Sequence, residues 1–238
     1  MRSMCGRYAL SAAISDIAEE FSTNSAPELS LPVDWNIKPT NDVYIIKNQA
    51  IEIASWGMIA HWSKSDDEAA KSQSSAINAR SESVHEKPTF KSAFRSNRCL
   101  LPATGYYEWA SELGKYKTKQ PIYISRDDNK LLAFTGIFQS WTSPSGRVIQ
   151  SVSIITRQAV GQLALVHSRM PVFLPRDRWA DWMNPKINDV EKIRSLMDVP
   201  TPDANLRFHP VSSAVNSIAG SGPGLIEPIE LGEPETLF

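Results

Sequence analysis

The sequence is poor in cysteine and contains no long apolar run. Its two cysteines, Cys5 and Cys99, have neither the spacing of a zinc site nor the number of a disulfide framework, so they favour a reducing cytoplasmic setting. No apolar stretch approaches the roughly 18 residues that cross a bilayer. The first residues also lack the charged-then-apolar pattern of a secretory signal. These absences argue against a membrane protein, a secreted protein and a structural zinc protein.

A strong charge imbalance is also missing. The formal net charge is −1 over 238 residues, which gives no overall attraction to nucleic acid or to a membrane surface. The content of 42% hydrophobic and 21% charged residues is ordinary for a soluble globular protein. Any anionic partner must therefore be bound by a local group of cations. No metal site and no cofactor site is expected.

The sequence shows no internal repeat, long linker or break in composition. Short β-branched and aromatic runs are separated by turn residues and are mixed with a few amphipathic segments. This pattern favours one α+β domain, with largely antiparallel, barrel-like β-sheets and peripheral helices, over a parallel array of βαβ units. We expect a monomer.

Turn residues divide the chain into its expected elements. Helices are expected at 14–21, after Pro88, at 159–165, at 179–183 and at 190–197. Strands are expected at 43–46 and 51–56, joined as a hairpin, and at 98–101, 106–110, 121–126, 131–139, 150–156, 172–174 and 206–211. Residues 35–40 are expected to form an extended loop, and the polar stretch 63–75 to be poorly ordered.

Cys5 follows Met4, a residue that could start translation. If Cys5 becomes the first residue, it carries a thiol with a pKa of about 8.5 beside an α-amine with a pKa of about 7.7–8.0. An amine and a thiol on neighbouring carbons can trap an aldehyde, first as a Schiff base and then as a thiazolidine ring. The alternative is that Cys5 packs as a small apolar side chain.

Three further residues have side chains suited to catalysis. Glu108 lies in a strand-like aromatic run, so it is either turned to water or buried, and burial would raise its pKa towards that of a general acid or base. His167 could move protons near neutral pH or have a structural role. Asn78 could act in a site or serve as a turn or cap residue. None of them forms a local catalytic motif.

Residues 77–98 form a basic region in an otherwise neutral chain. Five cations face two carboxylates, which gives a local charge of +3; the residues are Arg80, Lys87, Lys91, Arg95 and Arg98 against Glu82 and Glu86. Such a region is either a solvated surface or a place where phosphates bind.

Five motifs occur together in order. They are Met4-Cys5-Gly6-Arg7-Tyr8, Trp56-Gly57, Asn78-Ala79-Arg80-Ser81-Glu82, the run 102–109 that ends in Gly105-Tyr106-Tyr107-Glu108-Trp109, and His167-Ser168-Arg169-Met170-Pro171; the later His209-Pro210-Val211-Ser212 fits the same pattern. Together they resemble the SOS-response-associated peptidase (SRAP) family, the abasic-site processing proteins. The resemblance runs from Cys5 to about residue 230.

The resemblance implies a covalent sensor of abasic sites in single-stranded DNA. It implies that N-terminal Cys5 forms a thiazolidine cross-link with the ring-opened sugar and so shields the lesion during the DNA damage response. By similarity Asn78 orients the reacting groups, Glu108 is the acid/base, and His167 aids ring opening and reversal. The implied enzyme is a DNA–protein cross-linking or lyase-type protein with an associated (auto)peptidase activity, acting at the nucleoid of a bacterial-type cell.

Cations and aromatic rings would bind the DNA. Arg7, Arg80 and Arg169 are the expected phosphate-binding residues, and Trp62 is expected to stack on a flanking base. Two other functions stay open. In one, His167 activates the Cys5 thiol of a cysteine peptidase. In the other, the protein is a non-covalent single-stranded DNA binding module.

The chain departs from the family pattern at its front end. Met1, Arg2, Ser3 and Met4 precede Cys5, so Cys5 has no free amine in the sequence as written. We therefore expect residues 1–4 to be an extension absent from the mature protein, residues 5–230 to form the SRAP-like domain, and residues 231–238 to form a flexible tail.

Overall fold

Strand β10 (Val148–Gln158) is the strand around which the fold is assembled. The computed structural model describes residues 6–28, 30–110 and 119–231. Within them β10 pairs with β4 and β5 in parallel, and with β9 and β11 in antiparallel orientation. Because β10 has four pairing strands, neighbouring strands enclose it along most of its length. Its residues from Ser151 to Thr156 are all buried.

Five strands close into a barrel. Their order is β10-β4-β3-β6-β9, and β9 returns to pair with β10. The strands other than β10 are β3 (Asp42–Lys47), β4 (Ala50–Trp56), β6 (Arg98–Ala103) and β9 (Leu132–Thr142). Only the β4–β10 pairing is parallel. Asn48 and Gln49 both have positive φ, as a tight hairpin turn requires, and they join β3 to β4 as the sequence predicted.

Two short strands extend the barrel wall beyond its closed part. β5 (Asn78–Arg80) lies parallel to the second half of β10, and β11 (Arg169–Pro171) pairs antiparallel with the end of β10. They carry two of the motifs singled out in the sequence. The end of β10 therefore brings the residues around 78–82 next to the residues around 167–171.

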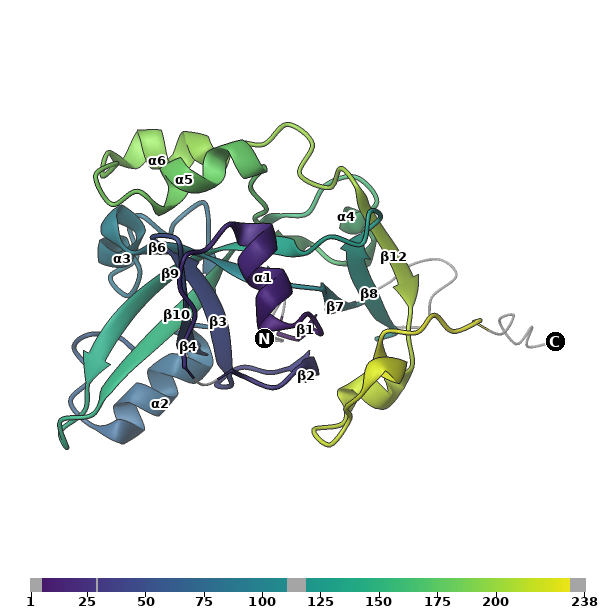
Figure 1. Ribbon diagram of the computed structural model, residues 1–238, viewed down its shortest axis with the longest axis horizontal. Helices are drawn as coiled ribbons and strands as arrows, with labels where there is room; N and C mark the ends of the chain where they lie inside the picture. Colours follow the sequence, from purple (N-terminus) through teal and green to yellow (C-terminus); the bar gives the residue numbers. More distant parts are fainter. Residues whose placement is uncertain (1–5, 29, 111–118, 232–238) are drawn as a thin grey trace.

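A second sheet lies beside the barrel (Figure 1), and all its pairings are antiparallel. Its order is β12-β8-β7-β1-β2, with bounds Leu206–Pro210, Pro121–Arg126, Gly105–Trp109, Tyr8–Leu10 and Asp34–Ile37. The first strand of the chain is thus an inner strand, held between β7 and β2. Tyr8 packs edge-on against Trp56 and Phe134 of the barrel, so the two sheets share one apolar core.

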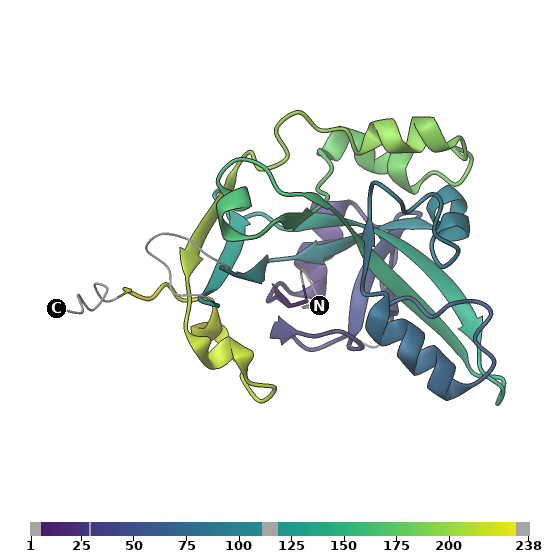
Figure 2. The same ribbon diagram turned by 180° about the vertical axis from the view of Figure 1, so that it is seen from behind.

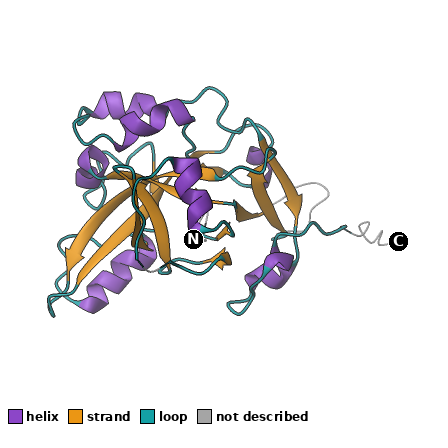
Figure 3. Cartoon of the chain, in the orientation of Figure 1, coloured by secondary structure: helices purple, strands orange, loops and turns teal. Residues whose placement is uncertain are grey.

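Helices lie outside the strands (Figure 3). Their bounds are α1 Ile14–Phe21, α2 Asp66–Ser75, α3 Lys91–Ser96, α4 Leu163–Val166, α5 Trp179–Met183 and α6 Val190–Leu196, with short 3-10 turns at Arg176–Arg178, Ser213–Asn216 and Pro223–Leu225. Seen from behind, α5 and α6 lie together at one end of the barrel and α2 at the other (Figure 2). Among the described residues, no helix is long and apolar enough to span a bilayer.

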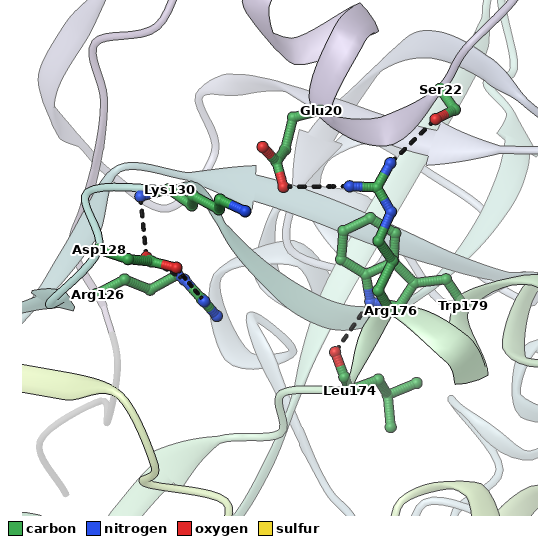
Figure 4. A network of polar contacts seen from close by, with 8 residues as sticks. All are labelled: Glu20, Ser22, Arg126, Asp128, Lys130, Leu174, Arg176 and Trp179. Carbon is green, nitrogen blue, oxygen red and sulfur yellow. Dashed lines mark hydrogen bonds and ion pairs between the residues drawn. The ribbon is translucent and has the colours of Figure 1, made fainter.

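The end of α1 is held by Arg176 and by Trp179, the first residue of α5 (Figure 4). Phe21 stacks on Trp179 with ring centroids 4.7 Å apart and an interplanar angle of 11°. Arg176 lies over the same indole, donates to Ser22 Oγ at 3.1 Å and pairs with Glu20 at 3.6 Å. Stacking joins the two elements, while the exposed ion pair contributes little free energy.

Arg98 is a buried cation that ties α3 to the chain around α5. Its guanidinium donates to five backbone carbonyls, those of Phe94, Arg95, Trp182, Asn184 and Ile187, at 2.6–2.9 Å. The side chain is 2% exposed. Since the last carbonyls of a helix have no partner within the helix, a buried arginine satisfies them at two helix ends together. In the sequence, Arg98 counts among the cations of the basic region. In the structure it is buried, so it is not part of a basic surface.

The α+β class and the barrel-like, largely antiparallel sheets are confirmed. Several local predictions differ from the structure. The helix expected at 159–165 is the shorter α4 at Leu163–Val166. The expected loop at 35–40 contains strand β2. The stretch 63–75, expected to be poorly ordered, contains α2, because Ser65 caps it and three acidic residues occupy its first turn. The strand expected at 172–174 begins earlier, as β11, and Phe173 makes an isolated bridge.

Candidate functional site

Glu108 is a buried carboxyl in the centre of the second sheet. It lies on β7, between β8 and β1, and is 4% exposed. Of the two orientations that the sequence allowed, the structure therefore has the inward one. Burial in surroundings of low dielectric constant disfavours a charged carboxylate, which is the condition under which Glu108 was predicted to act as an acid or base.

His167 meets Glu108 from the barrel side. It follows α4 directly, in extended conformation, and is partly buried. Its Nδ1 atom lies 4.0 Å from Glu108 Oε2. The same atom accepts a hydrogen bond from the backbone N–H of Arg169 at 3.1 Å. Two residues that are 59 positions apart in the sequence thus come together where the two sheets meet.

Asn78 and Arg80 lie on one face of β5, since side chains two residues apart in a strand share a face. Asn78 is partly buried and Arg80 is exposed. Arg80 is in register with Thr156 of β10, whose carbonyl accepts a hydrogen bond from Arg169 at 2.7 Å. Arg80 and Arg169 therefore both lie next to Thr156. The exposed position of Arg80 allows it to meet a phosphate from solvent.

Arg169 differs from a surface cation. Its Nη1 and Nη2 atoms bind both carboxylate oxygens of Glu82, at 2.5 and 2.9 Å, and its side chain is 11% exposed. This hydrogen-bonded guanidinium is the main reason why the pKa of Glu82 lies below its ordinary value. In the sequence, Glu82 is one of two carboxylates in the basic region and the last residue of a motif, with no partner assigned to it. The structure makes it the partner of a predicted site residue.

Arg7, two residues after Cys5, is bound to the late part of the chain. Its Nη1 atom donates to Asn36 Oδ1 and to the Val215 carbonyl, both at 2.7 Å. Burial lowers the pKa of Arg7. Asn36 is 1% exposed, and its amide donates to the carbonyls of Ser217 and Gly220. Arg7 thus connects β1, β2 and residues 213–220, which we call the C-terminal strap.

Sequence reasoning did not single out Asn36 as a functional residue. The partners of its side chain lie 29 to 184 residues away, so no local spacing could indicate it. A signal for Glu82 was present, because Glu82 is the last residue of the Asn-Ala-Arg-Ser-Glu motif. Without the structure, a glutamate in a basic region has no assignable partner.

Trp62 offers an exposed aromatic surface. It is 48% exposed and meets the His61 ring edge-on at 4.8 Å. The loop that carries it starts at Gly57, whose φ of +116° favours glycine and where a Cβ would lie 2.2 Å from the Gln73 carbonyl oxygen. That requirement explains the Trp56-Gly57 motif. Among the described residues, Trp62 makes its ring contact with His61. It makes no ring contact there with His167, the histidine of the predicted site.

Cys5 lies outside the described residues. Cys99 is fully buried, and burial raises the pKa of its thiol. In the described ranges no group of three or more His, Cys, Asp or Glu could hold a metal ion.

A pocket of about 750 Å³ opens beside Glu82 and Arg157 and is bordered by α6. Its described lining contains none of the predicted catalytic residues Asn78, Glu108 and His167.

Comparison with known proteins gives consistent matches. The family described as SOS response associated peptidase (SRAP) matches residues 4–218. The chain is 34% identical over 229 residues to the abasic site processing protein YoqW of Bacillus subtilis (strain 168), with 94% of this chain and 99% of YoqW covered. It is 31% identical to the abasic site processing protein HMCES of Gallus gallus over 238 residues, covering 90% of this chain and 68% of HMCES.

Solved structures share the fold. A protein from Bacteroides thetaiotaomicron superposes with a TM-score of 0.84 at 22% sequence identity, covering 95% of this chain and all of that chain. A phage-related protein from Bordetella bronchiseptica has a TM-score of 0.65 at 28% identity, covering 88% of this chain and 95% of its own. The barrel and the second sheet are thus features of an existing fold.

Proposed function

The chain belongs to the SOS response associated peptidase (SRAP) family of abasic site processing proteins, and on that premise we propose that it attaches itself covalently to abasic sites in single-stranded DNA through Cys5. The observation that carries the proposal is the approach of a buried carboxyl, Glu108, to within 4.0 Å of the imidazole of His167. Both residues lie in the region that the family matches.

Opening an abasic sugar requires proton movement at two oxygens. The sugar is mostly a closed hemiacetal. Ring opening breaks the bond between C1 and the ring oxygen, removes a proton from the C1 hydroxyl and adds a proton to the ring oxygen. A buried carboxyl beside an imidazole has the groups for this exchange, and we assign the proton transfers to Glu108 with the help of His167. Asn78 orients the reacting groups.

The α-amine and the thiol of a free N-terminal Cys5 then react in turn. The amine adds to the aldehyde carbon, and loss of water gives a Schiff base. The thiol adds to the same carbon and closes a thiazolidine ring, which removes the electron sink that would otherwise promote β-elimination and strand cleavage. The lesion is shielded in an intact strand. This scheme requires that Met1–Met4 be absent from the acting protein.

Arg80 and Trp62 are the DNA contacts that exposure favours. Arg80 projects from the face of β5 that carries Asn78, where it can meet a phosphate near the reacting sugar. Trp62 has the exposed ring surface that base stacking needs. Arg7 and Arg169 stay proposed DNA contacts as well, although each already binds groups of the protein. We propose that the protein acts as a monomer.

The proposal is tested by incubating the protein with single-stranded DNA that contains one abasic site and resolving the product by denaturing gel. We expect a stable adduct that is lost in Cys5→Ala and kept in Cys99→Ala, because the Cys99 thiol is buried. Borohydride reduction of the abasic aldehyde before mixing should abolish the adduct. An adduct that persists in Cys5→Ala would rule out Cys5 as the attachment point.

The same samples separate the alternative functions. Equal, salt-sensitive binding of intact and abasic strands with no covalent product would indicate a non-covalent binding module. Cleavage of a peptide substrate that is lost in Cys5→Ala and in His167→Ala would indicate a cysteine peptidase. Intact mass of the purified native protein shows whether Cys5 is its first residue. Retention of residues 1–4 in a protein that forms the adduct would contradict the thiazolidine scheme.

A further inference from the structure

Glu82 fixes the position of Arg169. The two carboxylate oxygens bind the two terminal nitrogens of the guanidinium in the bidentate arrangement that is strongest for this pair. Arg169 Nη2 also donates to the Thr156 carbonyl of β10 at 2.7 Å. The guanidinium is therefore held from two sides, by the segment after β5 and by β10. Its rotation is prevented at both contacts.

The backbone of the same arginine contacts the imidazole. The Arg169 N–H lies 3.1 Å from His167 Nδ1. A backbone N–H can only donate, so Nδ1 must present its lone pair and carries no proton. A neutral imidazole with an unprotonated Nδ1 has its proton on Nε2.

The other groups near Nδ1 do not compete for this bond. The Arg169 carbonyl oxygen lies 3.4 Å from Nδ1, and Glu108 Oε2 lies 4.0 Å from it. Both distances exceed the range of about 2.7–3.2 Å for an N–H···O hydrogen bond. The amide of Arg169 is thus the best-placed partner of Nδ1. Its own position depends on β11, to which Arg169 belongs, and on the side chain that Glu82 holds.

We propose that Glu82 is a positioning residue which, through Arg169, keeps His167 neutral with its proton on Nε2. The term positioning rests on the proposed function, because the site is catalytic only if that function holds. In this arrangement Nδ1 cannot accept a proton as long as it accepts the hydrogen bond from the Arg169 N–H. His167 acts on the sugar through Nε2–H as a hydrogen-bond donor, and proton transfer itself is left to Glu108.

Histidine tautomers are read directly by NMR. Protein labelled with ¹⁵N-histidine and free of DNA gives long-range ¹H–¹⁵N correlations, in which protonated and unprotonated ring nitrogens have separate shifts. We expect His167 of the wild type to show an unprotonated Nδ1 and a protonated Nε2. In Glu82→Ala we expect the shifts of Nδ1 and Nε2 to move towards each other. Without Glu82 the Arg169 N–H is no longer fixed opposite Nδ1, so the imidazole is no longer held in one tautomer. Glu82→Gln keeps the size of the side chain and gives a second variant should Glu82→Ala fail to fold.

Glu86→Ala is the matched control. Glu86 lies four residues after Glu82, its side chain is 72% exposed, and it approaches His85 instead of Arg169. It should leave the His167 signals unchanged. Adduct formation on abasic single-stranded DNA should fall about tenfold to a hundredfold in Glu82→Ala, since small displacements of a reacting group cost such factors.

The outcomes separate this proposal from the proposed function. A proton on Nδ1 of the wild type, or identical His167 signals in the wild type and in both folded Glu82 variants, would overturn it. The expected signals in a protein that forms no abasic adduct would support the role of Glu82 in holding the imidazole and would reject the proposed function instead.

Discussion

His167 Nδ1 lies 4.0 Å from Glu108 Oε2, although one residue follows a short helix beside the barrel and the other lies in the middle strand of the second sheet. The contact exists only because the two sheets pack against each other. Any displacement of one sheet relative to the other changes this distance. The site is therefore sensitive to packing between the sheets as well as to its own side chains.

Replacement of Glu108 by Gln is expected to slow adduct formation by about 10²–10⁴-fold, the usual contribution of a general acid or base. The amide has nearly the same size as the carboxyl but cannot exchange the proton. The rate is measured in single turnover on abasic single-stranded DNA. Glu52→Gln, on the exposed side of β4, is the control and should keep the wild-type rate. An unchanged rate in Glu108→Gln would show that the proton transfers use another group.

Replacement of Arg98 by Met is expected to lower the free energy of unfolding by at least about 3 kcal/mol, because five backbone carbonyls, all buried or partly buried, lose their donor. Urea unfolding measures it. Arg95→Met removes a neighbouring, exposed arginine with one long bond to Asn188, at 3.4 Å, and should change stability by less than about 0.5 kcal/mol. Equal effects of the two substitutions would contradict the role given to Arg98.

Replacement of Asn36 by Ala is expected to release the C-terminal strap, since the Asn36 amide binds the carbonyls of Ser217 and Gly220. Hydrogen exchange of peptides that cover residues 213–220 should become faster, while exchange in β9 and β10 stays slow. Asn24→Ala, which removes one exposed bond to Gln49, is the control. Unchanged exchange of the strap would show that its other contacts, such as those of Arg7 with Val215 and of Trp109 with Asn216, are enough to hold it.

The Glu82–Arg169 pair gives a defined pH dependence. The pKa of Glu82 in the folded protein is lowered from 4.5, mainly by the hydrogen bond from Arg169. A lowered native pKa means that the pair stabilises the fold fully above the unfolded pKa of about 4.5 and loses this contribution as the pH falls through the native pKa. The stability difference between wild type and Glu82→Gln should therefore shrink below about pH 4.5 and be constant from about pH 6 to 8. Since Glu82 is half-exposed, the whole effect should stay within about 1 kcal/mol.

Local chemistry made part of the fold predictable. The β-branched runs on either side of Asn48 and Gln49 predicted a hairpin, and the period of Ile14, Ile17 and Phe21 predicted α1. Strand β2 and the start of β11 were missed because their pairing partners, at Tyr8–Leu10 and in β10, supply the hydrogen bonds that define them. Helix α2 was missed because its polar composition hid a cap and an acidic first turn.

The candidate site was predictable only as residue types. Glu108 and His167 were identified as an acid/base and a proton-moving group, yet nothing in the chain gives the distance between them. Arg169 stays a predicted phosphate-binding residue, but its partner Glu82, a carboxylate 87 residues away, has no visible link to it in sequence. Cys5 stays a prediction, outside the described residues.

The bond from Arg7 to the Val215 carbonyl spans 208 residues. A ribosome working at about 5–20 residues per second delivers Val215 on the order of tens of seconds after Arg7. Strand β1 also waits for its neighbour β7, about a hundred positions later. The earliest part of the chain to be made is thus among the last to be secured, and a nascent chain released before residue 215 would leave its front end without this attachment.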